Sequence, residues 1–210
     1  MDRPDDSVDR VAADTGFSGV VRVDRDGEVA LARAYGLAHR GWGVANTVDT
    51  RFAIASGTKG LTALTVVDDY VLSVPVHELA TTEQYLRVLD GYPTSFAPGA
   101  RFAYNNGGVY TTAADVHALW AALFDGRIVS PGWVEEMVRP HSEVPSASMR
   151  YGLGFWLHAS RDTVMLEGAD AGVSFRTVHD PAGRLTHTVL SNTSDGAWPV
   201  TRRLDALLGR

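Results

Sequence analysis

Ser56 and Lys59 are the residues whose types and spacing most directly suggest chemistry. Lys59 is the only lysine; every other basic residue is arginine. Residues three apart share a helix face, so the Ser56 hydroxyl and the Lys59 amine can meet if a helix begins here. An amine can lose its proton, whereas a guanidinium effectively cannot, and a serine needs such a base to become a nucleophile. Gly57 and Gly60 are expected to leave room for a substrate. The pair predicts a nucleophile and its base, with an N-cap serine beside an exposed lysine as the alternative.

Two further stretches could take part in the same chemistry. The Tyr104 hydroxyl could relay the serine proton, and the Asn106 amide could hold both the lysine and a substrate carbonyl. In the stretch Gly168-Ala-Asp-Ala-Gly172, Gly172 could let a strand backbone approach a substrate and donate an N–H to an oxyanion. Taken alone, the first stretch is explained better by a buried tyrosine beside a turn, and the second by a glycine-bearing hairpin.

The elements that must position these residues follow from hydrophobic periodicity and turn signals. Helices are expected at 6–14, from 56 to before 75, and at 76–92, 112–124, 131–138 and 198–208. Strands are expected at 17–23, 28–35, 51–55, 151–158, 163–168, 173–179 and 185–191. Thr112 and Asp115 fit a capping box at the start of one helix. This order favours an α+β fold, with an antiparallel sheet flanked by N- and C-terminal helices.

In order along the chain, these stretches resemble the serine β-lactamase and penicillin-binding-protein superfamily. Its marks are S-x-x-K, then Y-x-N, then K-T-G or H-x-G on a strand. The likeness is greatest to the class C β-lactamase-like branch, which includes D-amino-acid peptidases and related esterases. It covers most of the chain and rests also on the stretches FSGVVRV, FAIASGTKGLTAL, APGARFAYNN, GGVYTTAADVHALWAAL and YGLGFWL.

The resemblance implies a role for each candidate residue. Ser56 would be the acylated nucleophile, Lys59 its proton acceptor and Tyr104 a second base, with Asn106 supplying an amide. Backbone N–H groups of Ser56 and of a residue near Gly172 or Val173 would form the oxyanion hole. The expected substrate is a small ester, amide or peptide, such as a β-lactam, a D-amino-acid peptide or a short-chain ester.

Two departures from the family pattern affect these expectations. Ala169 or Asp170 stands where the family has His or Lys, and an aspartate would repel a substrate carboxylate. An esterase, or a peptidase of different specificity, therefore fits better than a penicillin-type enzyme. The chain between Lys59 and Tyr104 is also short for the family. We expect a single domain over 1–210, with a reduced helical part at 56–140 and a sheet part at 15–55 and 150–210.

Composition excludes several other classes of protein. The net charge of −6 without a basic cluster argues against a nucleic-acid surface. No apolar run is long enough to span a membrane. The acidic start has no secretory h-region, so a cytoplasmic protein is expected, with a processed secreted form left open. The seven histidines lack the spacing of metal ligands, and no metal or cofactor is expected.

Two alternatives to an active hydrolase remain open at this stage. The missing third-motif base and the reduced helical part fit a binding protein that has lost catalysis. They also fit a minimised form of such an enzyme. In that form an apolar helix face carrying Leu61, Leu64 and Val67 would be uncovered and would favour self-association.

Overall fold

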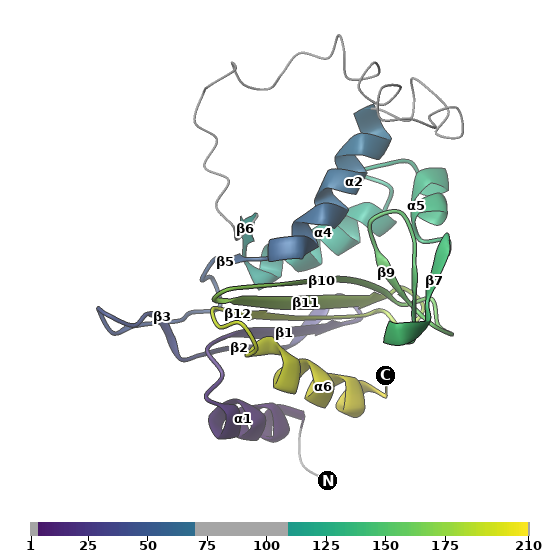
Figure 1. Ribbon diagram of the computed structural model, residues 1–210. Coiled ribbons are helices and arrows are strands. Elements are labelled where there is room, and N and C mark those ends of the chain that lie inside the picture. The colour runs from purple at the N-terminus through teal and green to yellow at the C-terminus, as the bar shows by residue number, and fades with distance from the viewer. Residues whose placement is uncertain (1–3, 70–108, 210) are drawn as a thin grey trace, which may run out of the picture.

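An eight-stranded antiparallel sheet forms the centre of the molecule (Figure 1). The computed structural model describes residues 4–69 and 109–209. The strand order in the sheet is β2-β1-β12-β11-β10-β9-β8-β7. The strands are β1 Gly19–Arg25, β2 Glu28–Tyr35, β7 Ser142–Val144, β8 Met149–Tyr151, β9 Trp156–His158, β10 Val164–Asp170, β11 Val173–Asp180 and β12 Leu185–Ser191. This arrangement confirms the predicted α+β class with an antiparallel sheet.

Helices cover both faces of the sheet, as Figure 1 shows. Helices α1 (Pro4–Thr15) and α6 (Ala197–Leu208) lie on one face, so the two ends of the chain come together. Helices α2 (Thr58–Asp69) and α4 (Ala113–Phe124) lie on the other, and α5 (Pro131–Met137) packs beside α4. All seven residues of β12 are buried because this strand has covered faces on both sides. Its central polar residues therefore need partners inside the protein.

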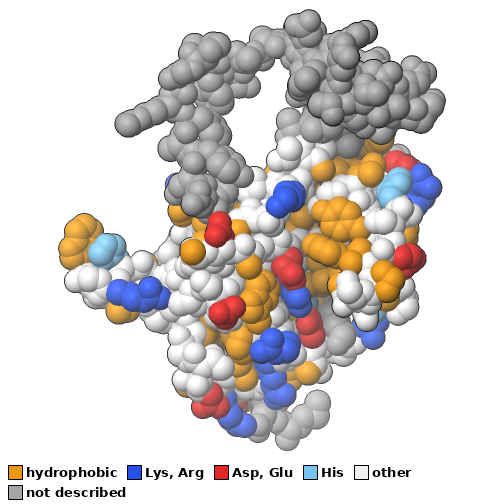
Figure 2. All heavy atoms as spheres, viewed as in Figure 1, with side chains coloured by type: hydrophobic (Ala, Val, Ile, Leu, Met, Phe, Trp, Pro, Cys, Tyr) orange, Lys and Arg blue, Asp and Glu red, His pale blue; other side chains and the backbone are white. Residues whose placement is uncertain are grey.

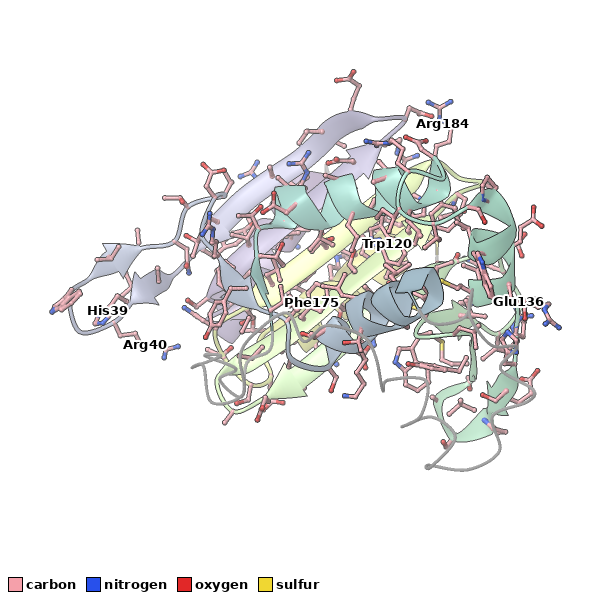
Figure 3. All side chains as sticks on the ribbon, turned by 90° about the horizontal axis from the view of Figure 1, so that it is seen from above. His39, Arg40, Trp120, Glu136, Phe175 and Arg184 are labelled. Atoms are coloured by element: carbon pink, nitrogen blue, oxygen red, sulfur yellow. The ribbon has the colours of Figure 1, made fainter. Side chains whose placement is uncertain are left out.

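Each face of the sheet has its own hydrophobic core. The core under α1 and α6 includes Val8, Val21, Val189, Val200 and Leu204. The core on the side of α2 and α4 includes the larger side chains Leu64, Trp120, Leu123, Phe155 and Phe175. In Figure 3, Phe175 lies beneath the start of α2, and Trp120 projects from α4 toward the sheet. The second core is therefore the platform that supports the Ser56 turn.

The predicted capping box at the start of α4 is confirmed. The Thr112 Oγ1 accepts the Asp115 backbone N–H at 3.1 Å, and the Asp115 carboxylate accepts the Thr112 N–H at 3.4 Å. Gly126 follows the helix in the left-handed region at φ 69° and closes its end, as its position in the sequence predicts. These contacts join residues three or so apart, so the local sequence is sufficient to predict them.

Two of the expected elements differ in the structure. The run 151–158, expected as one strand, is split between β8 and β9. The break is at Gly154, whose φ of 87° a strand does not accommodate. A Cβ at this position would lie 2.5 Å from the Ala63 Cβ. The stretch after β2, for which no helix or strand was expected, forms a small hairpin of β3 (Leu37–His39) and β4 (Val44–Ala45).

This small hairpin projects from the body, and Figure 2 shows hydrophobic, histidine and basic side chains at its end. Trp42 near its tip is 82% exposed and stacks on His39, with ring centroids 4.3 Å apart.

β7 is a further short strand that the sequence analysis did not predict. It pairs with β8 at the edge of the sheet, where short pairings leave little periodicity to detect.

The apolar face at the start of the expected helical region packs against the core. Leu64 is buried and Leu61 packs against the core, so the expectation that this face is uncovered is wrong for these two residues. The expected helix at 76–92, and the side chain of Val67, lie outside the described residues. Self-association through this face, and the division of the chain into sheet and helical parts, stay predictions. None of the helices within 4–69 and 109–209 is long and apolar enough to cross a membrane.

Candidate active site

Ser56 lies in a tight turn between a short strand and a helix. Strand β5 (Phe52–Ala53) leads into a 3₁₀ turn (Ala55–Gly57), and α2 begins at the next residue. Ala55 has a φ of 43°, in the left-handed region that is costly for a residue with a Cβ. The turn leaves Ser56 exposed although Ala55 and Gly57 on either side are buried. Such a turn presents one hydroxyl to solvent on a rigid base.

Lys59 faces Ser56 across this first turn of the helix. The Lys59 Nζ and the Ser56 Oγ are 2.6 Å apart, a short hydrogen bond along which a proton can move. Lys59 is exposed, and so is the serine. The geometry is the one that a spacing of three residues at a helix start allows.

The glycines of this segment do not make room for a substrate, contrary to expectation. A Cβ on Gly57 would lie 2.6 Å from the Phe175 ring, and a Cβ on Gly60 would lie 2.3 Å from the Leu166 side chain. Both glycines therefore face the core beneath α2. Their missing side chains let the helix start lie directly on the sheet, which fixes the height of Ser56 above β10 and β11.

Gly168 of β10 passes directly beneath the Ser56 turn. A Cβ there would lie 2.1 Å from the Ile54 carbonyl oxygen, 2.7 Å from the Ser56 nitrogen and 2.8 Å from the Gly57 nitrogen. These neighbours are backbone atoms that no rotamer change can move aside. Only a glycine allows the strand to approach the Ser56 backbone this closely.

The edge of β10 beside this contact is open. Strand β9 pairs only with Val164 and Met165, so within the described part of the chain no strand covers the outer edge from there to Asp170. A two-residue turn joins β10 to β11, with Asp170 opposite Val173. In such a hairpin the two residues that flank the turn form backbone hydrogen bonds with each other. The backbone N–H and C=O groups of the next residue along each strand point away from the partner strand. The Ala169 N–H is therefore directed to the open edge, beside Ser56.

A small cavity of about 170 Å³ lies between this edge and the start of α2. The described residues that line it are Ala55, Ser56, Thr58, Lys59, Thr62, Ala169 and Asp170. Lys59 and Asp170 are the charged members of this set. On one side is a hydroxyl with an amine beside it, and on the other is an unpaired strand edge. Together they can hold a carbonyl group between a nucleophile and N–H donors.

The predicted site residues fall into three groups. The structure brings Ser56, Lys59 and Asp170 to one cavity. Gly172 and Val173 lie at the hairpin tip, where the Gly172 N–H already donates to the Ser194 hydroxyl at 2.9 Å. Tyr104 and Asn106 lie outside the described residues.

Thr58 and Thr62 were not singled out in the sequence, and Ala169 was named there only as a position where the family can have His or Lys. Thr58 Oγ1 accepts the Val109 N–H at 3.1 Å, and Thr62 Oγ1 donates to the Thr58 carbonyl at 3.2 Å. These bonds brace the helix start that carries Lys59. The signal for Ala169 was its place directly after Gly168, but choosing between Gly168 and Gly172 required the strand register.

A second cluster of polar side chains lies buried under α4. The Asp24 carboxylate lies 2.9 Å from His117 Nδ1, and His117 Nε2 lies 3.0 Å from Thr188 Oγ1. Thr177 Oγ1 lies 2.7 Å from Thr188 Oγ1 and accepts the Trp120 Nε1–H at 2.9 Å. These connected side chains have the residue types of a catalytic triad, but Thr188 is fully buried, so no substrate can reach it. The cluster satisfies the polar residues of the central strands instead.

The electrostatics of this cluster follow from its burial. Burial lowers the pKa of His117 to about 4, although the Asp24 carboxylate opposes the shift. Burial also raises the pKa of Asp24, but hydrogen bonds from Arg22 and His117 outweigh it and hold that pKa below its ordinary value. At neutral pH the cluster therefore contains a neutral imidazole beside an Arg22–Asp24 ion pair.

Comparison with known proteins agrees with this architecture. A family model described as Beta-lactamase matches residues 5–71, a range that includes β1, β2, the Ser56 turn and α2. No curated protein matches the chain. Among solved structures, a penicillin binding protein from Bacillus halodurans has a TM-score of 0.72 at 19% identity, covering 99% of this chain and 100% of that one. The chain has the penicillin-binding-protein and β-lactamase fold.

Other structures with this fold are named for different activities. EstCE1, described as a hydrolase with promiscuous acyltransferase activity, has a TM-score of 0.66 at 16% identity, covering 96% of this chain and 98% of that one. A D-amino acid amidase from Ochrobactrum anthropi SV3 has a TM-score of 0.61 at 14% identity, covering 98% of each chain. At these identities the structures show the fold alone. With the family match, they support placement in the β-lactamase/transpeptidase-like superfamily.

Proposed function

We propose that this protein is a serine hydrolase that cleaves an ester or amide through an acyl-enzyme on Ser56. The observation that carries the proposal is the 2.6 Å contact between Lys59 Nζ and Ser56 Oγ, in a cavity whose other wall is the open edge of β10. The β-lactamase-like fold adds support, since similar structures are named as a hydrolase and an amidase.

In the proposed first step, the neutral amine of Lys59 accepts the Ser56 hydroxyl proton while Oγ bonds to the substrate carbonyl carbon. The carbonyl oxygen becomes an oxyanion that accepts the backbone N–H groups of Ser56 and Ala169. We assign the second donor to Ala169 rather than to Gly172 or Val173, because Ala169 lines the cavity and the Gly172 N–H is engaged by Ser194.

The oxyanion then collapses, and the alcohol or amine leaves with the proton from Lys59. Water attacks the resulting Ser56 ester, Lys59 accepts the water proton and returns it to Oγ, and the carboxylic acid product departs. Each half-reaction passes one proton through the same amine, and no other co-reactant is required. These reaction steps need a base and an oriented hydroxyl, and the Ser56 turn supplies both.

The finer assignment to the class C-like branch is also a proposal, with Tyr104 as a second base and Asn106 as an amide donor. It is supported by the way the chain returns to the site. Val109 accepts the Ile54 N–H at 3.0 Å and donates to Thr58 Oγ1. Val109, which follows Tyr104 and Asn106 closely in the chain, thus lies beside the Ser56 turn.

Active-site labelling tests the proposal directly. A fluorophosphonate should modify the folded protein at Ser56, and p-nitrophenyl butyrate should give a burst of nitrophenol followed by a slower steady state. Ser56→Ala should lose both. Lys59→Arg should lose most of the burst, because the guanidinium keeps the charge but does not act as a base. Ser146→Ala, at an exposed serine, is the matched control and should behave as wild type.

The competing function is a binding protein without turnover. It is favoured by the exposure of both Ser56 and Lys59, which leaves the developing charge in contact with water. That function predicts ester or amide binding with no burst and no label on Ser56. Folded wild-type protein that binds the ester but is indistinguishable from Ser56→Ala in both assays would establish it and overturn the hydrolase.

A further inference from the structure

Asp170 is placed to read the charge of a substrate. Successive side chains of a strand alternate between its faces. Leu166 and Gly168 of β10 face the start of α2, since Leu166 touches the Gly60 position and Gly168 the Ser56 backbone. Asp170 shares that parity and lines the same cavity as Ser56, whereas Glu167 on the opposite face pairs with Arg176.

The carboxylate is held in this position by its own turn. Asp170 Oδ1 accepts the Ala171 N–H at 2.7 Å, which fixes the side chain at the hairpin and leaves the second oxygen for other partners. Asp170 is exposed, so a ligand can reach that oxygen from the cavity.

The charges around the cavity favour a positive ligand group. Among the described residues that line it, only Lys59 and Asp170 carry charge. Asp170 is the only acidic side chain among the described residues of this lining. A substrate carboxylate near it is repelled, and an ammonium is attracted.

We propose that Asp170 is a specificity-determining residue that selects substrates whose acyl group carries a cation, and discriminates against those carrying a carboxylate. This inference rests on the proposed hydrolase function, because it concerns the charge preference of that same site. The substrate class is an aminoacyl or other ammonium-bearing ester or amide. A three-methylene spacer, which places a cation about 5 Å from the scissile carbonyl at ordinary bond lengths, is used to test it.

Three p-nitrophenyl esters with the same three-methylene spacer isolate the effect of charge. The cationic ester is that of 4-(trimethylammonio)butyrate, the neutral isostere is 5,5-dimethylhexanoate, and the anionic one is the glutarate monoester. At low salt, kcat/KM should be about threefold higher for the cation and about threefold lower for the anion than for the neutral ester, as unit charges about 6 Å apart in a largely aqueous site would give.

Asp170→Asn keeps the oxygen that accepts the Ala171 N–H and removes the charge, so the cation-to-anion ratio should fall to near one. Asp14→Asn removes one exposed carboxylate from α1, on the other face of the sheet, and should keep the wild-type ratio. In wild type the ratio should also shrink between 10 mM and 1 M salt, where the Debye length falls from about 30 Å to about 3 Å. This measurement serves if the Asn variant does not fold.

The outcomes separate the two proposals. Turnover of the neutral ester, with a cation-to-anion ratio near one in wild type or an unchanged ratio in Asp170→Asn, overturns the role of Asp170 and leaves the hydrolase standing. A ratio that does not respond to salt does the same. Failure to hydrolyse any of the three esters, together with no fluorophosphonate label on Ser56, overturns the hydrolase and this inference with it.

Discussion

His117 should make the protein lose stability as the pH falls from 7 to 5. The residue is 7% exposed, and burial lowers its pKa from 6.5 to about 4. The unfolded chain therefore takes up a proton on this ring below about pH 6.5, while the folded chain does so only near pH 4. Between these values the unfolded state binds more protons, so the free energy of unfolding falls with pH.

The magnitude follows from the width of that window. One pKa unit corresponds to 1.36 kcal/mol, and about one and a half units of the window lie above pH 5, which gives a loss of about 2 kcal/mol. Asp24 acts in the same direction, because its folded pKa is lowered. Its contribution is lost only below its ordinary value of 3.8, outside this range.

Urea unfolding followed by tryptophan fluorescence at pH 7 and pH 5 measures the loss. The same measurement on His117→Gln, which cannot titrate, isolates the part due to this ring. The variant should be less stable at pH 7 and should lose about 2 kcal/mol less than wild type between the two pH values. His39→Gln, in the exposed hairpin, is the matched control and should keep the wild-type dependence. An identical pH dependence in His117→Gln and wild type would refute the reasoning.

Three further substitutions test how the site is supported. Gly168→Ala would press a methyl group against backbone atoms of the Ser56 turn. It should therefore destabilise the fold by roughly 1–3 kcal/mol and abolish labelling of Ser56. Retained labelling in folded variant protein would contradict the close approach of β10 to the turn. Gly57→Ala would collide with the Phe175 ring and should lower the melting temperature, with recovery in the double variant carrying Phe175→Leu; an additive double variant would show that the ring is not the obstacle. Thr112→Ala removes the cap of α4 and should cost about 1 kcal/mol in chemical unfolding, with no change in the rate of hydrolysis.

The open side of the cavity has a consequence for catalysis. Ser56 and Lys59 are exposed in the part of the chain that the structure describes, whereas Gly57 and Ala55 beside them are buried. The proposed nucleophile is therefore fixed by packing below it. Rigid support from Phe175 and Leu166 sets the distance between Ser56 and the β10 edge, and this distance decides whether an oxyanion can reach two N–H donors.

Local sequence determined several features by itself. The Ser56–Lys59 pair, the capping box of Thr112 and Asp115, and the hairpin between β1 and β2 join residues only a few positions apart. Their geometry depends on helix and turn spacing, which the chain carries locally. Hydrophobic periodicity was enough to predict the antiparallel sheet with helices at both ends, because each long strand and helix buries one continuous face.

Tertiary structure alone decided which backbone meets Ser56. The sequence analysis favoured Gly172 and Val173, yet the strand register sets Gly168 beneath the serine and directs Ala169 to the open edge. A shift of one residue in register exchanges the faces of a strand, and the Ser56 turn that one face of β10 meets lies more than a hundred residues earlier in the chain. The true role of Gly57 also depends on Phe175, more than a hundred residues away in the chain. The local sequence therefore determines which residue types are available for the proposed chemistry. Long-range packing determines which part of β10 faces them.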